Sequence, residues 1–296
     1  MKNFWSKTGW TCMAFVPVIA SLFAQIAMGA IVSIILSVKA VASGMDYMDS
    51  MNYIMEQAMQ ASSIMVFVYH ILSIPIFGVW YYFGCGRPKF KASVKQIKPV
   101  CIPATIVLAT GLNLFANGFI FLGNFLFPEA IARYEALMEQ AGMGQNFFTI
   151  FAAVCLAPIG EEILCRGIAW HYASKVVKGM KSETAAFWIV NCITALGFGI
   201  MHANLIQGTY AFFLGLGIGF LRHRYNSLLP AMFAHFVVNA ISSFLPESTF
   251  AWIPETLVAA ILFTTVSIII IASGTVIELK GHKKEAVAVE AASVTE

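Results

Sequence analysis

Long runs of apolar residues follow one another along the chain, and short polar segments connect them. The first three runs extend from about Trp10 to Val38, from about Ser62 to Phe83 and from Cys101 to Phe127. About twenty consecutive apolar residues are enough for a helix to cross the hydrocarbon core of a bilayer. The pattern therefore predicts three membrane-spanning helices in the first half of the chain.

The second half continues the same pattern with shorter connections. A fourth run extends from about Phe147 to Trp170, and the turn-like segment Ala203–Gly208 separates a fifth run from a sixth. The seventh begins near Leu228, and the eighth covers about Pro254 to Ser273. We therefore expect an all-α fold: a polytopic membrane protein with a bundle of about eight transmembrane helices.

Two segments between these runs have the pattern of amphipathic helices. Met45–Ala61 carries methionines at helical spacing and acidic residues on its other faces. A methionine stripe could bind a soft metal, but it is more often the apolar face of a helix lying at the membrane surface. Pro128 opens a second, short polar helix, for which we expect a surface position.

Composition and charge support a membrane location and indicate an orientation. Of the 296 residues, 59% are hydrophobic and only 11% are charged, which is too few to cover a soluble surface. Fifteen of the eighteen Lys and Arg residues lie in the two termini and in three alternate loops. By the positive-inside rule, both termini are then cytoplasmic. We expect the most basic loop, residues 87–98, to contact lipid headgroups, and we expect no nucleic-acid binding.

Three charged residues interrupt the fourth apolar run: Glu161, Glu162 and Arg166. A charge at membrane depth costs at least ~2.5–3.5 kcal/mol, so it rarely persists without a partner and a function. On a helix, Glu162 and Arg166 are four residues apart and share a face, which predicts an ion pair. Glu161 points roughly 100° away from that face. It is therefore the carboxylate left to face a cavity.

Two later runs carry polar residues with the same spacing of four. One has Phe198 followed by His202, and the other has His235 followed by Asn239. A single His on an apolar helix is more often a satisfied core residue than a catalyst. Here, three consecutive apolar stretches together carry two histidines, an unpaired Glu and an Asn. This combination favours a functional site.

These side chains could activate water for peptide-bond hydrolysis without a Ser or Cys nucleophile. Glu161 would act as general base and His202 would assist the proton transfer, while His235 and Asn239 would stabilise the oxyanion. The alternative is a divalent metal such as zinc bound by Glu161, His202 and His235. The sequence has no His-Glu-x-x-His motif, so the metal version has weaker support.

The three stretches, in this order, resemble the signature of the CPBP family of intramembrane proteases. That family includes CAAX prenyl endopeptidases and proteins of bacteriocin processing and immunity. The resemblance covers about residues 147–239, and Cys165 departs from the aromatic or aliphatic residue usual before the Arg. It implies an eight-helix bundle that cleaves membrane-associated, often lipidated, proteins or peptides near their C-termini. The family has been described both as metalloproteases and as metal-independent glutamate proteases.

The resemblance suggests a division of the chain. We assign residues 1–145 to an N-terminal membrane region, 146–245 to a catalytic core, 246–285 to the last span and its basic end, and 286–296 to a disordered tail. Two non-catalytic functions remain as alternatives: an immunity protein that acts by binding, and a proton-coupled transporter. A transporter is expected to contain internal repeats, whereas each motif here occurs once.

The predicted spans leave the depth of one residue open. Loop counting places Glu161 and His235 near mid-membrane but His202 close to the outer turn. Either the fifth and sixth spans form a hairpin that stops short of the surface, or their broken ends line a water-filled cavity. We expect the cavity, because irregular backbone at membrane depth is tolerated where it lines water.

Overall fold

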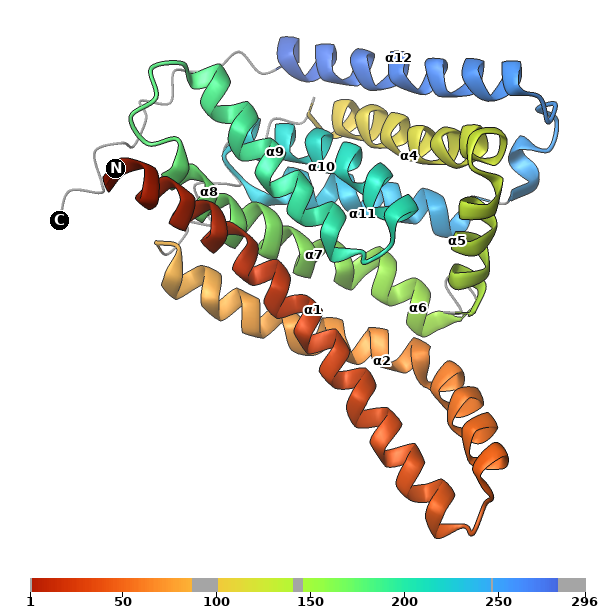
Figure 1. Cartoon of the computed structure of the whole chain (residues 1–296). Coiled ribbons are helices and arrows are strands. Elements are labelled where there is room, and N and C mark those ends of the chain that lie inside the picture. Colours follow the sequence, from red (N-terminus) through yellow and green to blue (C-terminus); the bar gives the residue numbers. More distant parts are fainter. Residues whose placement is uncertain (1, 87–100, 141–145, 246, 282–296) are drawn as a thin grey trace.

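The computed structural model of the chain describes residues 2–86, 101–140, 146–245 and 247–281. These residues form helices and contain no strand, which confirms the all-α prediction (Figure 1). The predictions for the basic loop 87–98 and for the tail 286–296 lie outside the described residues.

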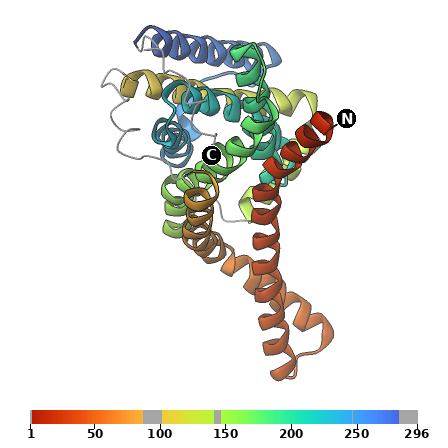
Figure 2. The ribbon, with the colours of Figure 1, turned by 90° about the vertical axis from the view of Figure 1, so that its left-hand side faces the viewer.

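The two N-terminal helices are the longest of the described chain. Helix α1 (Lys2–Ala42) and helix α2 (Tyr47–Gly84) extend together beyond the other helices as an arm, visible in both views (Figures 1 and 2). The carboxylate of Asp46 caps α2 by accepting a hydrogen bond from the backbone N–H of Asp49. The inner halves of both helices pack against the rest of the bundle.

The expectation of a separate interfacial helix at Met45–Ala61 is wrong. This segment and the second span form the single helix α2. No Gly or Pro occurs between Met45 and Ile74, so nothing interrupts the backbone hydrogen bonding where the composition changes from amphipathic to apolar. The change of composition marks a change of environment along one helix.

Helices α4 (Cys101–Leu126) and α12 (Leu257–Gly281) lie side by side along one flank of the bundle (Figure 1). Glycines allow this close contact. A Cβ on Gly111 would lie 2.8 Å from the backbone nitrogen of Ile271, so a larger residue would force the helices apart. Helix α5 (Pro128–Gln140) is the predicted short helix after Pro128.

The charged motif lies on a continuous helical rod that contains two wide turns. Its parts are α6 (Phe147–Phe151), the π-helix η1 (Ala152–Leu156), α7 (Ala157–Glu162), the π-helix η2 (Ile163–Ala169) and α8 (Trp170–Val176). In a π turn the hydrogen bond joins residues five apart instead of four, and such turns are frequent at functional sites. Glu161 and Glu162 therefore lie between two departures from regular α-helix.

The remaining helices complete the bundle around this rod. Helix α9 (Glu183–Met201) and helix α10 (Leu205–Tyr225) form a hairpin, and α11 (Leu228–Phe244) follows. The short 3₁₀-helix η3 (Glu247–Phe250) leads to α12. The hairpin backbones approach closely near its turn.

Seven helices of the described chain are long and apolar enough to cross a membrane, and an eighth apolar helix, Leu228–Phe244, is shorter at 17 residues. Each of the eight expected spans is thus present as a helix. The chain is a polytopic helical membrane protein. The seven long helices are Ser6–Ala42, Tyr47–Gly84, Cys101–Leu126, Phe147–Val176, Glu183–Met201, Leu205–Tyr225 and Leu257–Lys280.

A buried apolar cluster holds the rod against both N-terminal helices. Leu164, Cys165 and Ile168 of η2 pack with Val18 of α1 and Phe77 of α2. Cys165, which stands where the resembled family usually has an aromatic or aliphatic residue, is fully buried in this cluster. The difference therefore affects side-chain packing. The cluster fixes the position of the rod along α1 and α2, and with it the position of the charged residues one turn away.

Candidate active site

The ion pair predicted from the four-residue spacing is present and fully buried. Nη1 of Arg166 lies 2.9 Å from Oε1 of Glu162, and neither side chain is exposed. Nη2 of Arg166 also donates to the carbonyl of Gly215 on α10, at 3.0 Å, and the guanidinium lies over the ring of Phe198, 4.6 Å from its centre. Arg166 therefore neutralises Glu162 and ties the rod to α9 and α10.

His235 of α11 shares the oxygen of Glu162 that Arg166 binds. Its Nδ1 lies 2.9 Å from Oε1 of Glu162. An ionised carboxylate only accepts hydrogen bonds, so Nδ1 carries the hydrogen and, in the neutral ring, Nε2 carries the lone pair. Glu162 thus fixes both the orientation and the tautomer of His235.

Glu161 faces the other nitrogen of the same imidazole. Its Oε2 lies 3.8 Å from Nε2 of His235, beyond hydrogen-bond distance. A single water about 2.8 Å from both atoms would bridge them. The side chain of Glu161 keeps 16% of its surface accessible, whereas Glu162 keeps none. Water can therefore reach Glu161 and not its neighbour.

Phe198 connects both histidines to the ion pair. Its ring contacts His235 edge to face, with 5.5 Å between the centroids, and contacts His202 in the same way at 5.2 Å. His202 is the residue that ends α9. It lies one helical turn, about 5.4 Å, beyond Phe198, so the turn between α9 and α10 is close to the level of His235.

This position bears on the depth of His202. Helices α9 and α10 are unbroken up to their turn, and the turn itself lies near the level of the charged residues. The two helices form a continuous hairpin, so the expectation of broken helix ends was wrong. The depth of this hairpin in the membrane stays a prediction. The close packing of the two glycine-rich helices makes such a hairpin possible.

Asn239 contacts the backbone of the rod. Its Nδ2 donates to the carbonyl of Ala153 in η1, at 2.8 Å. Arg222 of α10 makes a similar bond to η2, from its Nε to the carbonyl of Arg166 at 3.1 Å. Side chains from neighbouring helices thus bind the backbone of both π segments. The contribution of Asn239 to an oxyanion site stays a prediction.

The residues proposed as metal ligands do not form a ligand set. Among the described residues, no group of three or more His, Cys, Asp and Glu side chains is arranged to hold a metal ion. Glu161 and His235 lie together, but His202 does not join them around a common point. The binding of a divalent metal at this site stays a prediction.

A polar group on α2 was not predicted from the sequence. Tyr69, His70 and Ser73 lie on one side of this helix, and His70 is buried against Gly160, the residue before Glu161. The available signal was a lone His in the apolar run Ser62–Phe83. A lone His carries little information by itself, so it gained meaning only from its place beside the charged motif.

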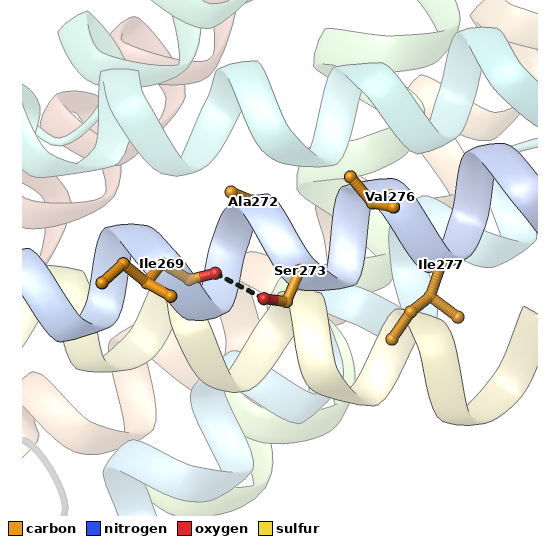
Figure 3. A pocket seen from close by; sticks show the side chains of 5 residues that line it. All are labelled: Ile269, Ala272, Ser273, Val276 and Ile277. Atoms are coloured by element: carbon orange, nitrogen blue, oxygen red, sulfur yellow. Dashed lines mark hydrogen bonds between the residues drawn. The ribbon is translucent and has the colours of Figure 1, made fainter.

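A groove on α12 offers no competing site. Its lining residues all belong to one helix: Ile269, Ala272, Ser273, Val276 and Ile277 (Figure 3). The hydroxyl of Ser273 donates to the carbonyl of Ile269 in the same helix, at 2.8 Å. No charged side chain lines the groove, so it is an apolar outer surface.

A comparison with protein families identifies the part of the chain that holds the site. Residues 143–241 match the family model described as type II CAAX prenyl endopeptidase Rce1-like. This third of the chain is similar to that family, and we refer to residues 143–241 as the Rce1-like domain. This domain includes Glu161, Arg166, His202 and Asn239, and it confirms the resemblance to the CPBP proteases. Searches of curated proteins and of solved structures gave no match.

The Rce1-like domain supports one class of activity. The matching family is named for an endopeptidase, and three helices of the domain, within residues 147–225, are long and apolar enough to cross a membrane. An intramembrane endopeptidase is the activity that agrees with both observations. Such an enzyme acts on a peptide or protein substrate at the bilayer.

Proposed function

We propose that this protein is an intramembrane endopeptidase in which Glu161 activates a water molecule. One observation carries the proposal: the carboxylate of Glu161 faces Nε2 of His235, at 3.8 Å, while Glu162 holds the opposite nitrogen of that ring. A carboxylate and an oriented imidazole on either side of one water position form a pair suited to general base catalysis.

The first step is the attack of water on the scissile carbonyl. The bridging water donates one hydrogen bond to Oε2 of Glu161 and the other to Nε2 of His235. Glu161 takes the first proton while the water oxygen bonds to the carbonyl carbon, and the π electrons move to the carbonyl oxygen. This gives a tetrahedral oxyanion. In this tautomer, Nε2 of His235 accepts a hydrogen bond and cannot donate one to the oxyanion. We therefore assign the stabilisation of the oxyanion to His202, with Asn239.

The second step releases the products. The C–N bond of the tetrahedral intermediate breaks, and protonated Glu161 returns its proton to the leaving nitrogen. The products are a carboxylic acid and an amine, and Glu161 is again ionised. Arg166 takes no proton in either step. Its ion pair with Glu162 holds in place the carboxylate that orients His235 through the cycle.

The family name indicates the substrate class. We propose cleavage near the C-terminus of a membrane-associated protein or peptide whose C-terminal region carries a lipid, as in CAAX substrates. Such a substrate reaches the site from the bilayer, where the apolar helices of the Rce1-like domain lie. Processing of a bacteriocin-like peptide would use the same chemistry on a substrate without the lipid.

We predict that Glu161→Gln reduces cleavage to background without loss of folding. The amide has the size of the carboxylate but cannot take a proton from water. Purified protein in lipid vesicles is incubated with a prenylated C-terminal reporter peptide and with the same peptide lacking the lipid, and products are identified by mass spectrometry. Glu183→Gln, at the exposed start of α9, serves as control and is expected to retain full turnover.

Two results would contradict this function. Turnover by Glu161→Gln at the wild-type rate would remove the proposed base. Protection of cells that persists in this variant, with no cleavage by the wild type, would favour a binding-only immunity protein. The same assay tests metal dependence: we expect activity to survive 1,10-phenanthroline, and a loss that zinc restores would show that the enzyme is a metalloprotease.

A further inference from the structure

Helix α2 carries a polar side in a chain region that the Rce1-like match does not include. The hydroxyls of Ser21 on α1 and Tyr69 on α2 lie 2.5 Å apart and join these two helices. One turn further along α2, the hydroxyl of Ser73 donates to the carbonyl of His70 at 3.2 Å. Both Ser73 and His70 are buried in a helix that is otherwise largely apolar.

This polar side of α2 faces the charged motif. A Cβ on Gly160 would lie 3.7 Å from Oγ of Ser73 and 3.8 Å from Nδ1 of His70. The region around Glu161 is therefore bounded by polar groups of α2 as well as by His235 of α11.

The ring of His70 has an unused hydrogen-bonding atom. Its side chain is only 7% exposed, and Nδ1 has no hydrogen-bond partner among the described residues. A buried polar atom without a partner costs about 1–3 kcal/mol relative to a satisfied one. A Phe or Leu would fill this space without that cost. The nitrogen is therefore available to a partner that does not belong to the described residues.

We infer that His70 is a substrate-positioning residue, whose Nδ1 accepts a hydrogen bond from a backbone N–H of the substrate beside the scissile bond. The inference rests on the proposed endopeptidase function. Within the hydrocarbon core, a peptide N–H has no water to bind, so a protein acceptor has a large effect on its binding. Gly160, the residue before Glu161, lies beside this nitrogen and carries no side chain there.

Two substitutions at this position separate positioning from packing. His70→Phe keeps an aromatic ring and removes both nitrogens. We expect about a tenfold or larger loss of kcat/KM, with most of the change in KM, because a substrate N–H is left unpaired. Thermal stability is expected to stay equal or to rise, since the variant also removes an unsatisfied buried atom. His70→Asn places an amide near the position of Nδ1, and we expect it to restore most of the activity.

A binding measurement makes the test independent of the chemical step. In the Glu161→Gln background, the labelled reporter peptide is titrated in lipid vesicles by fluorescence anisotropy. Adding His70→Phe is expected to weaken its affinity about tenfold. The control is His171→Phe on α8, a half-buried His outside this region, for which we expect unchanged affinity and turnover.

The outcomes distinguish this inference from the proposed function. Unchanged affinity and unchanged kcat/KM in His70→Phe would refute the role of His70 and leave Glu161 as the proposed base. So would an activity loss matched by an equal loss of folded protein, because that result indicates packing alone. Absence of cleavage by the wild type would refute the proposed endopeptidase, while the affinity comparison would still decide whether His70 binds the peptide.

Discussion

Arg166 is surrounded by groups that depend on its charge. It binds the carboxylate of Glu162, the carbonyl of Gly215 and the face of Phe198, and it is fully buried. A buried ion pair contributes little net stability by itself, because both charges lose their hydration. Its value here is positional, since the pair holds the oxygen that orients His235.

We predict that Arg166→Met destabilises the protein by about 3–5 kcal/mol, because the charge of Glu162 is left buried without compensation. The double variant Glu162→Gln with Arg166→Met is expected to be more stable than Arg166→Met alone. Thermal and denaturant unfolding in detergent measure both. Arg133→Met, at an exposed position of α5, is the control and should change stability by about 0.5 kcal/mol or less. A single variant as stable as the double would show that the pair is not electrostatically coupled.

The site could be predicted only where its contacts are local in sequence. Glu162 and Arg166 are four residues apart, and helical geometry alone predicts their contact. The bond between His235 and Glu162 joins residues 73 positions apart, so it depends on the packing of α11 against the rod. The same holds for His70, whose neighbour Gly160 has no polar side chain to suggest a contact.

At the scale of elements, the hairpin of α9 and α10 depends on glycine. A Cβ on Gly199 would lie 2.5 Å from the carbonyl oxygen of Gly208, and a Cβ on Gly208 would lie 2.8 Å from that of Gly199. Two backbones in direct contact cannot accept a methyl group between them. This contact lies three residues before His202, so it also fixes where that imidazole is placed.

We predict that Gly199→Ala separates the two helices at their turn and lowers both stability and turnover. Overpacking of this kind costs about 1–3 kcal/mol. The displaced His202 should reduce cleavage even where the variant is still folded. Gly29→Ala on α1 is the matched control, because a Cβ there meets nothing within 4 Å and only improves helix propensity. Equal turnover and stability of the two variants would contradict this account.

The sequence was less informative about where elements begin and end. It predicted a helix for each apolar run because length and hydropathy are direct consequences of the membrane. It divided α2 in two because a change of composition resembles a boundary, although no Gly or Pro ends the helix there. Distant side chains bind carbonyl groups of η1 and η2, and no local sequence pattern predicts these contacts.

At the scale of the whole molecule, positively charged residues gather at one end of the bundle. The ammonium of Lys175, in the last turn of the rod, lies 4.2 Å from the ring of Trp10 near the start of α1. Nη2 of Arg224, at the end of α10, donates to the carbonyl of Leu279 at the end of α12, at 3.0 Å. Basic residues thus join the ends of helices in two pairs, α8 with α1 and α10 with α12.

We predict that this end faces the cytoplasm, together with both termini. A protease-cleavable tag at either terminus should be resistant in intact cells and sensitive in inverted vesicles. A tag on the connection between α1 and α2, residues 43–46, should show the opposite pattern and is the internal control. Cleavage of the terminal tags in intact cells would reverse the orientation.

The two widened turns of the rod have a consequence for comparing this protein with distant relatives. Each one contains an additional residue without a matching gain in length, so the angular position of every later side chain is offset from that of a regular helix. Alignment by residue count across 147–176 would then pair side chains that point in different directions. Chimeras and transplanted motifs in this segment should preserve both insertions, or the two acidic residues will rotate away from the partners that define them.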